Sequence, residues 1–132
     1  MNRDFIKNQK GLIALITVLI VLAVTLVIGI GLGLRSVTEM KIGLQRSQSS
    51  QAYYLANLCS EHALMKLKED SNYTGNEATS TENGSCAILP IEGTWIIKVS
   101  ATSSDQVKKM KIVVNQINPK MIIDSWQEVA DF

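Results

Sequence analysis

The sequence predicts an α+β fold in which one long N-terminal helix precedes a small antiparallel sheet. Three observations lead to this prediction. Residues 12–34 form an unbroken uncharged run, and residues 35–70 behind it lack proline and space their apolar side chains three and four apart. Residues 86–132 contain stretches in which apolar and polar side chains alternate, as in half-buried strands. About a hundred residues follow the uncharged run, enough for one small domain.

The uncharged run is long enough to cross a membrane. Its 23 residues, beginning at Leu12, contain only two hydroxyl side chains, Thr17 and Thr25. As a helix they rise about 35 Å, slightly more than the roughly 30 Å of bilayer hydrocarbon. A cleaved secretory signal fits less well because its apolar core spans only about 7 to 15 residues. A helix in a soluble core would show a polar stripe, and this run shows none.

The cysteines indicate on which side of the membrane the rest of the chain lies. The basic leader, residues 1–11, and the segment after the run carry nearly equal charge, so the positive-inside rule does not choose an orientation. Cys59 and Cys86 are the only cysteines, and an even number in a small domain favours a disulfide in an oxidising compartment. That bridge is worth about 3.5 kcal/mol in the chain-entropy model. We therefore expect the C-terminal domain outside the cytoplasm; two unrelated buried thiols are the alternative.

The helix is expected to continue beyond the run as an amphipathic segment, residues 35–70. An unbroken helix from Leu12 to Glu69 has 58 residues and a length of about 87 Å. Residues 45–51 are polar all round, so the helix is expected to fray or bend there.

The remainder is expected to form a polar loop and a sheet. Residues 70–85 are rich in Asn, Ser, Thr and Gly, which is typical of a loop. Two strands follow, joined by a turn at residues 103–106, with these side chains on their apolar faces: Trp95, Ile97, Val99, Ala101, Met110, Ile112 and Val114. Pro119 ends the second strand. Residues 122–129 are expected to add an edge strand, and residues 86–91 a fourth strand interrupted by Pro90.

Three features resemble a known family. They are the basic leader ending in Lys10-Gly11, the uncharged run directly behind it, and the phrase QAYYLANLCSEHAL at residues 51–64. Together they resemble type IV pilin-like proteins, and among these the chain is most similar to PilX-type minor pilins. The resemblance covers residues 1–70, whereas the sheet region has only general support.

The resemblance implies processing followed by assembly. Prepilin peptidase would cut between Gly11 and Leu12, and the new amino terminus would be methylated. The subunit would reside in membrane lipid, engage an assembly platform, and join other pilin or pseudopilin subunits in a pilus or pseudopilus. Ile16 stands where major pilins carry glutamate, and Leu12 stands where phenylalanine is commoner. These departures favour a minor subunit at the start or tip of a filament. The competing function is an unprocessed single-pass membrane anchor that carries an extracytoplasmic binding or sensor module.

Gly29, Gly31 and Gly33 lie near the outer end of the run. Small residues let membrane helices approach closely, and glycine weakens a helix that water reaches. The three glycines therefore predict either a packing notch or a place where the helix melts on assembly. Glycines that lipid merely tolerates are the alternative. Taken as a two-residue alternation, they do not suggest a dimer motif.

Other candidate sites lack essential residues. A calcium loop starting at Asp70 would need an acidic side chain at its twelfth position, which is Thr81. His62 is the only histidine and has no second ligand at zinc spacing. Lys108, Lys109 and Lys111 could contact phosphates, but lysines on an exposed strand more often discourage aggregation. We therefore expect no metal, no cofactor, no catalytic residues and no nucleic-acid partner.

Overall fold

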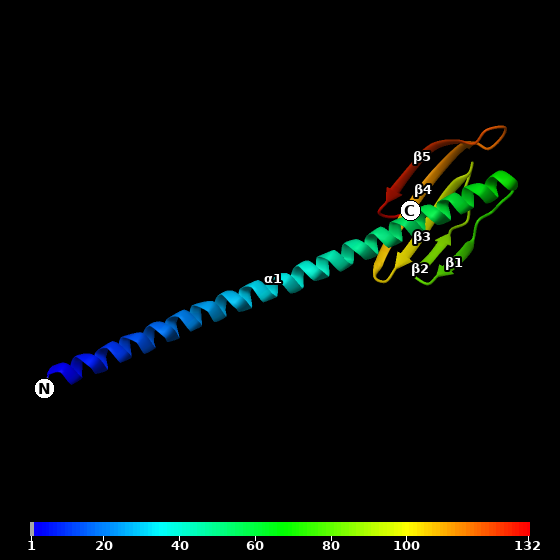
Figure 1. The fold of residues 1–132 in the computed structure, drawn as a ribbon. Coiled ribbons are helices and arrows are strands. Elements are labelled where there is room, and N and C mark those ends of the chain that lie inside the picture. Colours follow the sequence, from blue (N-terminus) through cyan, green and yellow to red (C-terminus); the bar gives the residue numbers. More distant parts are fainter. Residues whose placement is uncertain (1) are drawn as a thin grey trace. The chain divides into compact units, whose positions relative to one another are not determined.

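The computed structural model describes the backbone of residues 2–132 and the side chains from Lys10 onward. Most side chains of the expected leader therefore lie outside the described residues. The chain divides into two units, Met1–Ile42 and Gly43–Phe132. A single helix, α1, runs from Asn2 to Glu69, and five antiparallel strands follow it in the second unit (Figure 1). The fold is α+β, as the sequence predicts.

Helix α1 is longer and more regular than expected. It has 68 residues and begins at Asn2 rather than Leu12, so the leader and the uncharged run belong to one helix. Residues 45–51 stay helical, and the expected fraying is absent. This polar stretch already reaches the sheet, because the Gln51 amide oxygen lies 3.2 Å from the Ser103 hydroxyl and Ala52 is fully buried.

The strands form a simple meander in the order β1-β2-β3-β4-β5. Their bounds are Glu77–Thr81 for β1, Gly84–Ile88 for β2, Ile96–Ser103 for β3, Gln106–Gln116 for β4 and Ile122–Val129 for β5. The turn at residues 103–106, the end of β4 before Pro119 and the edge strand β5 agree with the sequence predictions.

Three expectations were wrong in detail. The segment expected to be a loop, residues 70–85, contains β1 and the start of β2. Strand β2 ends at Ile88, so it stops before Pro90 rather than continuing past it. Strand β3 begins one residue after Trp95, whose φ of +56° lies in the left-handed region and is incompatible with a regular strand.

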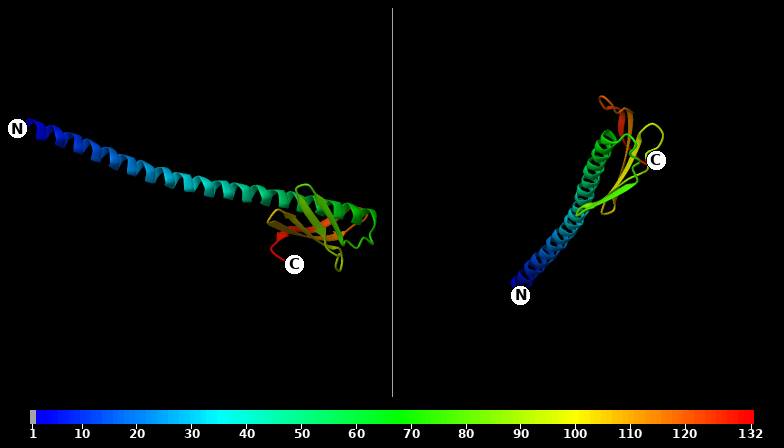
Figure 2. Two further views of the ribbon diagram at one scale, coloured as in Figure 1. Left: turned by 90° about the horizontal axis from the view of Figure 1, so that it is seen from below. Right: turned by 90° about the vertical axis from the view of Figure 1, so that its right-hand side faces the viewer.

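The core of the second unit lies between α1 and one face of the sheet (Figure 2). The helix contributes a stripe of mostly small side chains, and β2 to β4 contribute mostly branched ones. The buried set on the helix is Ala52, Ala56, Cys59, Ala63, Leu64 and Leu67, and the set on these strands is Cys86, Ile88, Ile97, Val99, Ala101, Met110, Ile112 and Val114. Small helix residues let the helix backbone approach the sheet closely, which places Cys59 above β2.

Candidate functional site

Residues 12–34 expose apolar side chains on every side of α1. The exposed fraction of their large apolar side chains ranges from 46% at Ile16 to 69% at Val27, so no face of this helix is covered within the first unit. In α1 one segment is long and apolar enough to cross a membrane. Exposing this much apolar surface to water costs free energy, which indicates that lipid or other protein covers it.

The two hydroxyls in this segment are satisfied by the helix itself. The Thr17 hydroxyl donates to the Ala14 carbonyl at 2.8 Å, and the Thr25 hydroxyl donates to the Leu22 carbonyl at 2.9 Å. Neither side chain needs water or a partner for its donor. The segment therefore offers its surroundings an almost entirely apolar surface, which suits a medium without hydrogen-bonding groups.

The residues of the predicted processing site lie within the helix. Lys10, Gly11 and Leu12 are all exposed, and apart from the helix's own backbone no described atom lies within 4 Å of the position that a Gly11 side chain would occupy. Ile16 is also exposed and places a branched apolar group on this part of the helix.

The three glycines near the end of the segment remain helical, and no side chain from Lys10 onward packs on them. Gly29 and Gly33 are four residues apart, so they share one face of α1, while Gly31 points to another. A prediction based only on the Gly-x-Gly alternation overlooks the pair formed by Gly29 and Gly33. The spacing of four was present in the sequence and is the one that allows close helix packing in membranes.

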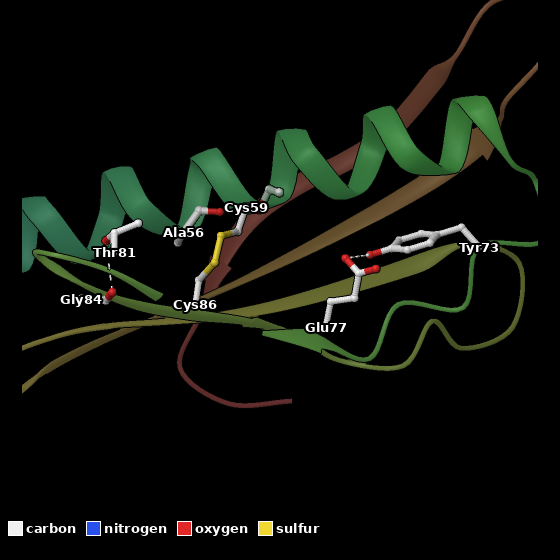
Figure 3. The surroundings of a disulfide bond; sticks show 8 residues. Ala56, Cys59, Tyr73, Glu77, Thr81, Gly84 and Cys86 are labelled. Carbon is white, nitrogen blue, oxygen red and sulfur yellow. Dashed lines mark hydrogen bonds between the residues drawn. A yellow bond between two sulfur atoms is a disulfide. The ribbon is translucent and has the colours of Figure 1, made fainter. Parts of the chain in front are cut away.

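The two cysteines join the helix to the sheet. Cys59 of α1 and Cys86 of β2 form a disulfide with their Cα atoms 6.6 Å apart, and both residues are buried (Figure 3). The adjacent buried hydroxyl of Ser60 donates to the Ala56 carbonyl at 2.7 Å. The bridge therefore crosses a buried interface and ties the second strand to the helix.

A cluster that sequence reasoning missed holds the start of β1 against α1. The Lys66 ammonium donates to both carboxylate oxygens of Glu77 at 2.7 and 2.8 Å, and the Tyr73 hydroxyl donates to the same carboxylate at 3.2 Å. The hydrogen bond from Lys66 lowers the pKa of Glu77. Burial, followed by the negative charge of Glu77 and the hydrogen bond to it, raises the pKa of Tyr73 to about 12.

The candidate calcium loop at Asp70 and the candidate phosphate-binding lysines of β4 make ordinary contacts within the chain. The Asp70 carboxylate accepts a hydrogen bond from the Asn72 amide, as in an Asx turn, and among the described side chains no group of three metal-ligating residues comes together. Lys108 pairs with Glu128 at 2.6 Å, and Lys109 pairs with Asp131 at 2.5 Å. These two lysines therefore neutralise carboxylates of the C-terminal segment.

Comparisons with protein-family models, with curated proteins and with solved structures find no match to this chain.

Proposed function

We propose that the chain is a minor, initiating or tip-type, type IV pilin-like structural subunit. Residues 12–34 first hold it in a membrane, and prepilin peptidase then cuts between Gly11 and Leu12. The same segment afterwards leaves the lipid and packs against the equivalent helices of other pilin or pseudopilin subunits. The observation that carries this proposal is the uncharged helix that exposes apolar side chains on every side directly behind Lys10-Gly11.

Exchanging lipid for protein is energetically feasible for such a helix. Its apolar surface stays out of water in both environments, so extraction does not cost the full transfer free energy from hydrocarbon to water. Removing the charged leader matters because a basic group would otherwise have to enter the apolar centre of a filament. Ile16 adds no charge to be paired during the exchange.

The disulfide supports an extracytoplasmic place for the second unit. Such bonds persist in oxidising compartments and are rare in the cytoplasm. The bridge between α1 and β2 therefore fits a sheet unit that lies outside the cytoplasm while the leader faces the peptidase inside.

Processing at Gly11 is the direct test. The full chain is produced together with an active prepilin peptidase, extracted from membranes, and its intact mass measured. We expect a mature chain that begins at Leu12. Production with a catalytically inactive peptidase is the control, and Gly11→Val should block the cut while leaving the membrane segment unchanged. A chain that keeps residues 1–11 beside the active enzyme would refute the proposal.

A second function is compatible with the continuity of α1. The helix passes from Asn2 through Gly11 into the uncharged run without interruption, so a leader that stays attached would simply extend the membrane helix. The alternative is thus a permanent single-pass anchor that carries an extracytoplasmic binding or sensor module. This alternative predicts that the intact mass measured in the same experiment is that of the chain with residues 1–11 still attached.

A further inference from the structure

The two edges of the sheet differ in how they are protected. At β5 the pairing with β4 is broken by register shifts next to Val114, and Glu128 of β5 binds Lys108 of β4. Bulges and charged side chains are the usual features that prevent another strand from adding to an edge. At β1, residues 78–81 read Ala-Thr-Ser-Thr, with no charge, no proline and a regular register to β2. Strand β1 has no partner on its outer side among the described residues.

A groove runs between this edge and α1. We call it the β1 groove and define it by Tyr54, Leu58 and Met65 of α1 together with Thr79 and Thr81 of β1. The three helix side chains lie on one face and are 71%, 58% and 64% exposed, although they belong to the part of α1 that packs on the sheet. They form an apolar wall beside the unpaired strand.

The β1 groove contains two cavities with the spacing of a strand. One, of about 300 Å³, is lined by Leu58, Cys59, Glu61, His62, Met65 and Thr79. The other, of about 350 Å³, is lined by Tyr54, Leu58 and Thr81. Thr79 and Thr81 are two residues apart, which is about 6.8 Å along a strand. A strand added beside β1 would have the same repeat, so its alternate side chains would enter the two cavities.

The edge is held in place before any partner arrives. At its start, Glu77 is bound by Lys66 of α1. At its end, the Ser103 hydroxyl of β3 donates to the Asn83 carbonyl at 2.8 Å, and the Thr81 hydroxyl donates to the Gly84 carbonyl at 3.1 Å. A preorganised strand loses little conformational entropy on binding, which favours affinity.

The charge around the groove indicates the composition of the partner. Glu61 and His62 both line the cavity next to Thr79, and Glu82 lies in the turn that follows β1. Neither carboxylate takes part in the four ion pairs found among the described side chains. The Glu61 carboxylate in the groove is therefore available to a basic side chain on a bound segment.

We propose that the β1 groove binds an extended segment of another protein, which adds as a sixth strand with apolar side chains at alternate positions and a basic residue beside them. Main-chain hydrogen bonds to β1 would supply affinity, and the two cavities would supply sequence preference. This interaction surface lies entirely within Gly43–Phe132 and does not depend on processing at Gly11.

A peptide selection tests the proposal. A random heptapeptide library displayed on phage is selected against the full chain in lipid nanodiscs, with empty nanodiscs for subtraction. We expect enriched peptides to alternate apolar and polar residues and to include Lys or Arg. A synthetic copy of an enriched peptide should slow amide hydrogen exchange in β1 but not in β5.

Matched variants locate the binding. Leu58→Lys places a charge between the two cavities and should weaken binding of the synthetic peptide about tenfold or more. Leu44→Lys makes the same change at a residue of α1 that is 60% exposed and lines neither cavity, and it should leave binding unchanged. Both sites are exposed, so folding should survive each change.

Several outcomes would overturn the inference. They are a library without enrichment, enriched peptides without alternation, protection of β5 instead of β1, and equal binding to both lysine variants. Concentration-dependent dimers that protect β1 without any peptide would show that a second copy, and not another protein, occupies the edge.

Discussion

At the scale of single residues, Glu77 organises the contact between β1 and α1. It accepts hydrogen bonds from Lys66, eleven positions earlier, and from Tyr73, four positions earlier. The sequence does not predict this cluster, because residues 70–85 have no periodicity that would place particular side chains together. The disulfide could be anticipated, since only two cysteines are present and each can pair only with the other.

The Lys66–Glu77 pair predicts a specific pH dependence of stability. Because the pKa of Glu77 is lowered in the fold, its stabilising contribution is present above the ordinary glutamate pKa of about 4.3 and is lost as pH falls through the lower folded-state value. Lys66→Met should therefore destabilise the second unit at pH 7 and much less near pH 3. Urea unfolding followed by tryptophan fluorescence measures the difference.

Lys68→Met is the control for this prediction. Lys68 lies in the same last turn of α1 but joins none of the ion pairs among the described side chains. An equal loss of stability for Lys66→Met at both pH values would contradict the proposed role of Glu77.

At the scale of elements, the strands with one buried face could be predicted from their alternation, whereas β1 could not. In β3 every second side chain is buried, from Ile97 to Ser103, and this alternation is visible in the sequence. In β1 four of five residues are exposed, so no alternation of apolar and polar residues marks it as a strand. Helix α1 ends where Lys66 and Lys68 complement the helix dipole, close to the predicted end.

The disulfide should contribute measurably to the stability of the second unit. It joins residues 27 positions apart, which corresponds to about 3.5 kcal/mol of loop entropy. Replacing Cys59 and Cys86 together by alanine should lower the free energy of unfolding by about that amount. Both tryptophans, Trp95 and Trp126, lie in this unit, so their fluorescence reports its unfolding.

Reduction of the native protein provides an independent comparison. A reducing agent should shift the urea midpoint of the wild type towards that of the double variant and should leave the double variant unchanged. A wild-type midpoint that does not respond to complete reduction would show that the bridge adds no stability.

At the scale of the whole molecule, the two units bury their apolar residues by different means. The second unit encloses a core between helix and sheet, whereas the first unit is helix alone with exposed apolar side chains. The sequence indicates the difference in burial but not the boundary at Ile42, because an uncharged run and a region of alternating strands have clearly different patterns. The exposed groove along β1 was not predictable, since it arises from how helix and strand meet.

The first unit should lose its membrane affinity when one central residue is charged. Leu22→Lys places an ammonium near the middle of residues 12–34, where insertion of a lysine costs about 2.5 to 3.5 kcal/mol. We expect a smaller fraction of this variant to remain in the membrane pellet after alkaline extraction. Val37→Lys, outside the uncharged run, should behave as the wild type. Equal retention of both variants would argue against a membrane-spanning role.

The covalent link between α1 and β2 also determines how the protein carries a pulling force. Tension applied between the two chain ends passes from Cys59 directly to Cys86 through the sulfur atoms. Residues 60–85 form a closed ring beside that route and bear little of the load. This ring contains the Lys66–Glu77 pair and all of β1. Under tension the protein would therefore keep the shape of its open sheet edge at β1.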